Sequence, residues 1–84
     1  MTHEEVYIIK AFLWLLRKSK EEGEDVSLMD LVSESPYKDF YLNNFRNFLD
    51  LPPRIFFAKI MKHERWSSYF MKVAEIFYEE LLNE

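Results

Sequence analysis

The chain has 84 residues, with no cysteine, one glycine, three prolines and a formal charge of −4, and 18% of its residues are aromatic. This length fits one domain. The lack of cysteine excludes disulfides, cysteine-ligated zinc, iron–sulfur clusters and a thiol nucleophile. The single glycine excludes the glycine-rich loops that bind phosphates and dinucleotides. With so few turn residues, we expect an all-α fold, a compact bundle of four to five helices formed by residues 1–84 as one domain.

The N-terminal segment and the apolar runs bear on location. The chain begins with acidic residues after Thr2 and His3, which is the wrong charge for a secretory leader. The most apolar run, residues 6–16, contains Lys10 and is much shorter than the roughly twenty residues of a membrane span. Together with the absence of cysteine, these features predict a cytoplasmic protein with no membrane contact.

The first expected helix covers residues 3–20. Thr2 and Glu5 have the spacing of a capping box, and Gly23 is a natural C-terminal stop. Between Tyr7 and Leu16 every residue except Lys10 is apolar, which is more than one core-facing stripe uses. The helix is therefore either the central element of the fold or a surface shared with a partner.

The middle of the chain predicts two more helices after an acidic turn over residues 21–25. Asp25 or Ser27 is expected to cap a short helix at about 27–33, and Ser35-Pro36 marks the next start. From 37 to 49 the apolar residues have helical spacing. Pro52-Pro53 then forces an extended break.

The last region, residues 53–83, contains no glycine and no proline after Pro53. One continuous helix would be about 45 Å long, whereas a compact domain of this size has a radius of gyration near 12 Å. We therefore expect a bend near 63–68, with Ser67 or Ser68 capping the final helix. The expected apolar stripe of that helix is Trp66, Phe70, Val73, Phe77 and Leu81.

Charge alternates along the chain. Residues 1–20 carry +2, 21–50 carry −6, 51–73 carry +4 and 74–84 carry −4. These blocks are expected to neutralise one another across the folded bundle. The alternative is a basic patch that binds a phosphate backbone or an acidic partner. Its members would be Arg54, Lys59, Lys62, His63 and Arg65.

Catalytic and metal-binding residues are few. The only histidines are His3 and His63, and Glu64, being adjacent to His63, points away from it on a helix. Glu75 and Glu79 share a helix face and are typical of an exposed acidic surface. We therefore expect a protein that is not an enzyme and has no metal, cofactor or small-molecule substrate.

The preferred hypothesis is a protein–protein interaction module that acts as an inhibitor, adaptor or subunit. Aromatic residues are enriched at the centres of such interfaces, and four of them lie off the main stripes: Tyr7, Trp14, Tyr37 and Phe40. An acidic rim that steers a basic partner would consist of Glu21, Glu22, Glu24 and Asp25. The partner is another protein or a second copy of this chain, a homodimer through the first or the last helix.

The alternative hypothesis is a small DNA-binding protein or transcription regulator. The helices at 27–33 and 37–49 have a helix-turn-helix-like spacing. Base-reading residues would be Asn43, Asn44, Arg46 and Asn47, and phosphate-binding residues would be Arg54, Lys59 and Lys62. The −6 charge over 21–50 opposes this hypothesis. A third class, an acidic decoy for a nucleic-acid-binding partner, uses the same carboxylates as the first hypothesis.

Overall fold

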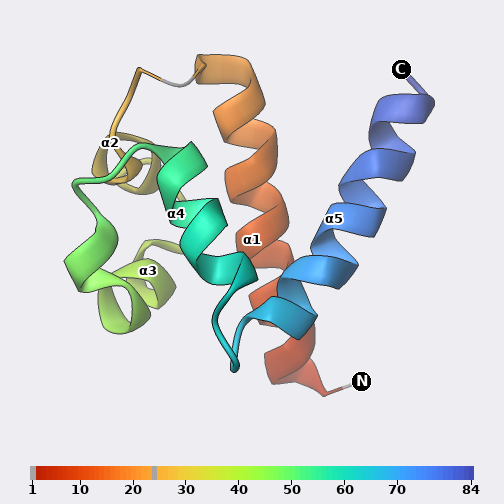
Figure 1. Ribbon diagram of the computed structural model, residues 1–84, viewed down its shortest axis with the longest axis horizontal. Helices are drawn as coiled ribbons and strands as arrows, with labels where there is room; N and C mark the ends of the chain where they lie inside the picture. Colours follow the sequence, from red (N-terminus) through yellow and green to blue (C-terminus); the bar gives the residue numbers. More distant parts are fainter. Residues whose placement is uncertain (1, 24) are drawn as a thin grey trace.

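The fold is an all-α bundle. In a computed structural model, which describes residues 2–23 and 25–84, the helices are α1 (His3–Glu22), α2 (Leu28–Val32), α3 (Lys38–Asn44), α4 (Pro53–Met61) and α5 (Ser67–Leu82). A short 3-10 helix, η1 (Arg46–Phe48), follows α3. Figure 1 shows α1 in the middle of the molecule, with α5 along one side and the three shorter helices on the other. The radius of gyration of 12.1 Å is that of a compact chain of this length.

Helix α1 begins and ends as the capping residues predict. The side chain of Thr2 accepts a hydrogen bond from the Glu5 backbone N–H at 3.1 Å. Gly23 has a φ of 85°, a conformation that side chains disfavour, and its N–H donates to the Ser19 carbonyl at 3.0 Å. The helix runs to Glu22, two residues beyond the expected end.

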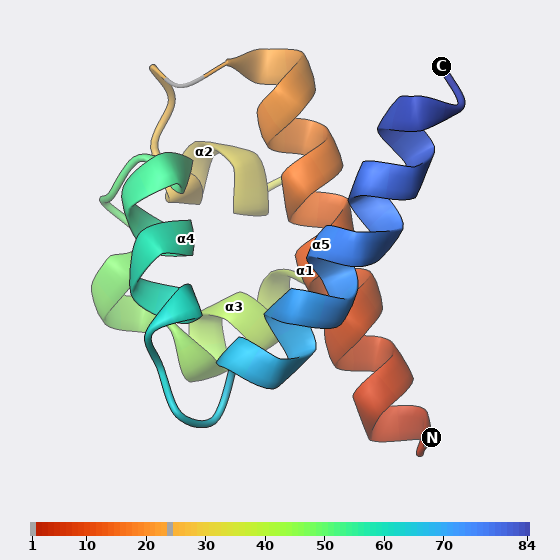
Figure 2. The same ribbon diagram turned by 45° about the vertical axis from the view of Figure 1, so that its right-hand side comes forward.

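Most of the apolar side chains of α1 that exceed a single stripe are buried within the fold. Its buried residues point in several directions and are Ile8, Ile9, Ala11, Phe12, Leu13 and Leu15. On one side, the Tyr41 hydroxyl of α3 donates to the Ala11 carbonyl at 2.6 Å. On another side α5 crosses α1, as Figure 2 shows. Of the two alternatives for this helix, the central element is therefore the one that the structure shows.

The second helix is capped by Ser27 rather than by Asp25. The Ser27 hydroxyl accepts from the Asp30 N–H at 3.3 Å, and the Asp30 carboxylate accepts from the Ser27 N–H at 3.4 Å. This reciprocal capping box fixes the start of a helix of only five residues.

The expected helix over 37–49 is wrong beyond Asn44. Helix α3 ends there, the backbone turns at Phe45 with a φ of −133°, and η1 follows. Asn44 Nδ2 donates to the Phe40 carbonyl at 2.8 Å, a local bond by which asparagine competes with helix continuation. The turn places the Phe45 ring 5.0 Å from Phe56 and 5.1 Å from Trp66, so core packing is gained where the helix is broken.

The region 53–83 forms two helices, as expected. Pro53 occupies the first turn of α4, and the chain bends between Lys62 and Trp66 before α5. The expected serine cap is wrong, because neither Ser67 nor Ser68 caps α5. The position before the helix is held by Trp66, whose ring is buried in the core, and the Ser67 N–H donates to the His63 carbonyl at 2.9 Å.

Helices α1 and α5 run in the same direction and are joined near their C-terminal ends. Arg17 pairs with Glu80, and Lys20 pairs with Glu84. The hydrogen bond between Arg17 and Glu80 raises the pKa of the arginine and lowers the pKa of the glutamate. Two cationic residues of the positive block 1–20 are thus paired with two carboxylates of the negative block 74–84. The apolar stripe of α5 is fully buried as far as Val73, Phe77 packs partly buried against the core, and Leu81 is 39% exposed.

Candidate functional site

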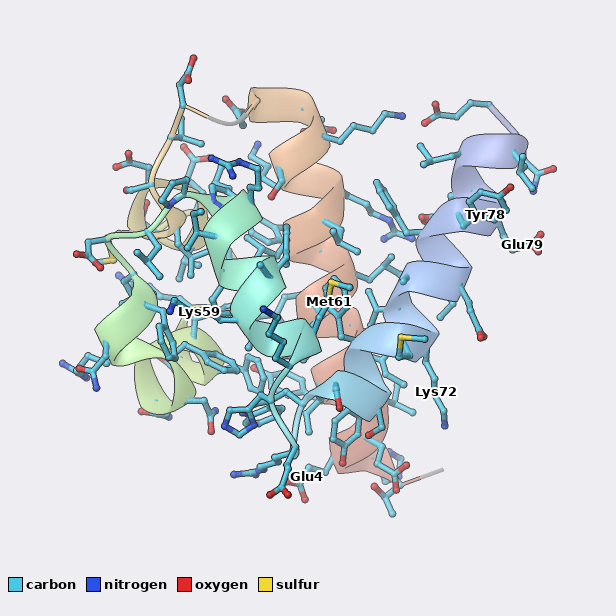
Figure 3. All side chains as sticks on the ribbon, viewed as in Figure 1. Glu4, Lys59, Met61, Lys72, Tyr78 and Glu79 are labelled. Carbon is cyan, nitrogen blue, oxygen red and sulfur yellow. The ribbon has the colours of Figure 1, made fainter. Side chains whose placement is uncertain are left out.

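A pocket of about 290 Å³ with an aromatic floor lies at the N-terminal end of α1. Figure 3 places Glu4 at this end of the molecule, which it shares with the loop between α4 and α5. Three segments far apart in the sequence line the pocket: the first turns of α1, helix α3 and the start of α5. The lining residues are Glu4, Tyr7, Ile8, Asp39, Phe40, Asn43, Asn44, Arg65 and Trp66.

The floor of the pocket is aromatic and rigid. Phe40 and Trp66 are 7% and 4% exposed, and their rings meet edge to face at 5.7 Å. Tyr7 forms a wall, since it is 42% exposed and its ring centroid lies 6.1 Å from that of Phe40. Because Phe40 and Trp66 both also touch Phe12 in the core, the floor is held by the packing of the whole domain.

The rim of the pocket is polar and carries a net negative charge. The carboxylates of Glu4 and Asp39 and the amide of Asn43 are exposed. In the described residues neither carboxylate lies within 4.0 Å of a cationic group. Arg65 also belongs to the rim, and its guanidinium carbon lies 4.4 Å from the Trp66 ring centroid, a cation–π contact. Because the rim has two carboxylates and only one guanidinium, it favours a cationic ligand.

The expected aromatic patch is assembled only in part. Tyr7 and Tyr37 meet at 5.3 Å, and Phe40 adjoins Tyr7. The expected exposure of Phe40 is wrong, because its ring packs against Phe12, Tyr41, Phe45 and Trp66. Trp14 is half-buried in a separate groove with Arg17, Lys18, Glu21 and Glu34.

The expected acidic rim does not surround the pocket. Lys18 lies 3.3 Å from Glu22 and 3.8 Å from Glu21, and its hydrogen bond with Glu22 raises the pKa of the lysine. Asp25 lines a different groove with Asp50 and Arg54. Glu24 lies outside the described residues. The rim is formed instead by Glu4 and Asp39, which the sequence reasoning missed. The sequence feature that points to this rim is residue spacing. Glu4 and Tyr7 are three residues apart and Asp39 and Asn43 are four apart, so each pair lies on one helix face.

The expected nucleic-acid-binding residues are spread over the molecule. Asn43 and Asn44 line the pocket, whereas Arg46 follows the break at Phe45 and lines a groove with Met29 and Asp50. Asn47 lies within η1 and is exposed. On α4, Arg54 stands in the first turn and Lys59 in the last, while Lys62 caps its end. The break in the expected recognition helix separates Asn43 and Asn44 from Arg46 and Asn47.

Groups for metal binding or membrane insertion are not found in the part of the chain that the structure describes. Within residues 2–23 and 25–84 no three histidine, aspartate or glutamate side chains gather as metal ligands would. None of the helices has both the length and the apolar content that crossing a bilayer requires, over these same residues. Comparison with protein-family models, with curated proteins and with solved structures gives no match for the chain.

Proposed function

We propose that this chain is a non-enzymatic protein-binding module, an inhibitor, adaptor or subunit, that captures a basic side chain of its partner in the pocket at the start of α1. One observation carries the proposal: two carboxylates without an ionic partner among the described residues stand over an aromatic floor beside the exposed ring of Tyr7. The pocket residues replace the 21–25 carboxylates as the contact surface.

Each part of an arginine or lysine side chain has a complementary group in this pocket. Its methylene stem covers the edges of Phe40 and Trp66, as long basic side chains commonly do on apolar surfaces. Its charged head reaches Glu4 and Asp39 and lies against the face of Tyr7, where a cation is attracted by the ring. The formal charge of −4 favours the encounter with a basic partner.

The size and the chemistry of the pocket favour a macromolecular partner over a substrate. A volume of about 290 Å³ is at the lower limit of small-molecule sites, which span roughly 300–1,000 Å³. It suits one side chain, with the surrounding surface in contact with the rest of the partner. The lining groups are carboxylates, amides, a guanidinium and rings, which recognise charge and shape without forming a nucleophile–base pair.

Fluorescence of Trp66 tests the proposal, because its ring forms the floor. With Trp14→Phe as the background, Trp66 is the one remaining tryptophan. The probe is acetyl-Gly-Arg-Gly-amide, compared with the same peptide carrying citrulline, a neutral analogue of arginine. We expect the arginine peptide to bind with a dissociation constant of about 1 mM, equivalent to about 4 kcal/mol. Asp39→Asn should weaken it about tenfold through loss of a charge-assisted hydrogen bond.

The matched control is Asp50→Asn, which removes an exposed aspartate from another groove. It should leave the affinity unchanged. The proposal fails if the citrulline peptide binds as tightly as the arginine peptide, or if Asp39→Asn and Asp50→Asn behave alike.

The alternative, a small DNA-binding protein, is favoured by one observation. None of the cations Arg54, Lys59, Lys62 and Arg65 forms an ion pair with a described residue. Titration with a mixed-sequence DNA duplex separates the two functions, since phosphate contacts strengthen steeply at low salt. We expect no binding at about 50 mM salt. Binding that weakens as salt rises, and that is lost in Lys59→Glu/Lys62→Glu, would favour DNA.

A further inference from the structure

A second surface, on α5, is apolar and without a partner in the structure. Its three most exposed apolar side chains are Met71, Tyr78 and Leu82, at 59%, 61% and 63%. At 100° per residue they lie within about 40° of one another around the helix. We call these three residues the outer stripe. It is distinct from the buried side of α5, which contains Phe70 and Val73.

The apolar surface continues beyond the outer stripe. Ala74 is half-buried and Leu81 is 39% exposed, and both lie between the stripe and the core. At the end of α4, Met61 is 57% exposed and lies on the side of α4 that faces α5 in Figure 3. Apolar patches of this kind, rimmed by polar groups, are typical of interaction sites.

Charges beside the outer stripe indicate what covers it. Lys72 and Glu79 are both exposed, are seven residues apart and stand on the outward side of α5 in Figure 3. Neither has an ionic partner within 4.0 Å in the described residues. The basic block 51–73 ends within α5 and the acidic block 74–84 begins there, so the helix is positive at one end and negative at the other.

Such a surface is complementary to itself when two copies run antiparallel. A two-fold axis near residue 76 places Lys72 opposite Glu79 of the second copy, and the same pair forms again on the other side of the axis. It also sets Met71 against Leu82, and Tyr78 near Glu75, whose carboxylate can accept a hydrogen bond from the phenol. A parallel pairing would instead place Lys72 against Lys72, which is repulsive.

We propose that the outer stripe is the interface of an antiparallel homodimer, formed by α5 of one copy against α5 of another. An interface of one helix pair is at the small end of specific protein contacts. We therefore expect a dissociation constant on the order of tens of micromolar. The proposal is independent of the peptide-binding pocket, because none of the residues that line the pocket belongs to the outer stripe.

Sedimentation velocity over about 5 µM to 1 mM tests the dimer. The mass should rise from 10.3 kDa toward twice that value. Tyr78→Ala/Leu82→Ala should weaken the dimer at least tenfold, and the exposure of both side chains leaves the fold intact, which circular dichroism checks. Met29→Ala is the matched control, since Met29 is 42% exposed but lies on α2.

A charge exchange tests the orientation. Lys72→Glu alone and Glu79→Lys alone should each weaken the dimer about tenfold, because like charges then meet twice across the axis. An equimolar mixture of the two variants should dimerise as the unmodified chain does, since every pair is again opposite in sign. A mass of 10.3 kDa at all concentrations overturns the proposal. So does a dimer that is insensitive to Tyr78→Ala/Leu82→Ala, or a mixture that does not recover.

Discussion

Replacing Phe12 by alanine is expected to lower the free energy of unfolding by about 3–5 kcal/mol. Phe12 is 0% exposed and lies at the centre of the aromatic core. Its ring centroid is 5.6–6.4 Å from those of Phe40, Tyr41, Phe45, Trp66 and Phe70. Deleting the ring leaves a cavity between α1, α3 and α5, and the rigid rings around it cannot collapse into it.

Urea unfolding followed by circular dichroism measures this loss. Small domains have only about 5–15 kcal/mol of total stability, so Phe12→Ala should populate the unfolded state even without denaturant if this domain is near the lower limit. Met29→Ala is the control, because Met29 is 42% exposed and such changes stay within about 0.5 kcal/mol. A loss below about 1 kcal/mol for Phe12→Ala would contradict the described core.

Alkaline pH is expected to destabilise the protein through Tyr41. The side chain is completely buried, and this desolvation raises its pKa well above the ordinary value of 10.0. Above pH 10 the unfolded chain releases the phenolic proton and the folded chain keeps it, so the unfolded state binds fewer protons. Stability from this group therefore falls as pH rises, by about 1.4 kcal/mol per pH unit.

The variant Tyr41→Phe isolates this effect from the other groups that titrate at high pH. Near pH 7 the variant should be about 1 kcal/mol less stable, because it lacks the 2.6 Å hydrogen bond to the Ala11 carbonyl. The difference should shrink above pH 10 and change sign near pH 11. Parallel stability curves for the two proteins from pH 8 to 11.5 would show that Tyr41 is not buried as described.

Helix ends were predictable wherever a local signal acts alone. Thr2 and Gly23 bound α1 and Pro53 opens α4. One helix over 53–83 would be too long for a compact domain, which requires the bend before α5. Each of these depends on backbone chemistry within a few residues. The same holds for the all-α class, which follows from scarce glycine and proline.

The break at Phe45 could not be read from the sequence in the same way. Periodicity continues smoothly through 45–49, and the helix ends because the core has space for that ring between Phe12, Phe56 and Trp66. Such a tertiary cause outweighs helix propensity, which is a weak preference. The loss of the helix also removes the regular surface on which the DNA-binding hypothesis placed Asn43 and Arg46.

The acidic residues of the pocket could not be predicted from the sequence for a related reason. Tyr7 and Phe40 were candidate contact residues, but the carboxylates beside them were expected from residues 21–25. Which acidic side chains meet which rings depends on how α1, α3 and the start of α5 pack. Glu4 of α1 and Asp39 of α3 line the same pocket as Tyr7, whereas Glu21 and Glu22 pair with Lys18 at the opposite end of α1.

Residue-resolved NMR with the arginine peptide tests the central claim most directly, since it locates the bound side chain. A titration observed in ¹H–¹⁵N spectra should shift the Trp66 indole and the amides of Tyr7, Phe40, Asn43 and Asn44. The citrulline peptide should leave them in place, and the amides of α2 and the outer stripe should not respond to either peptide. Shifts confined to another surface, or the same shifts with both peptides, would contradict a pocket that binds a basic side chain.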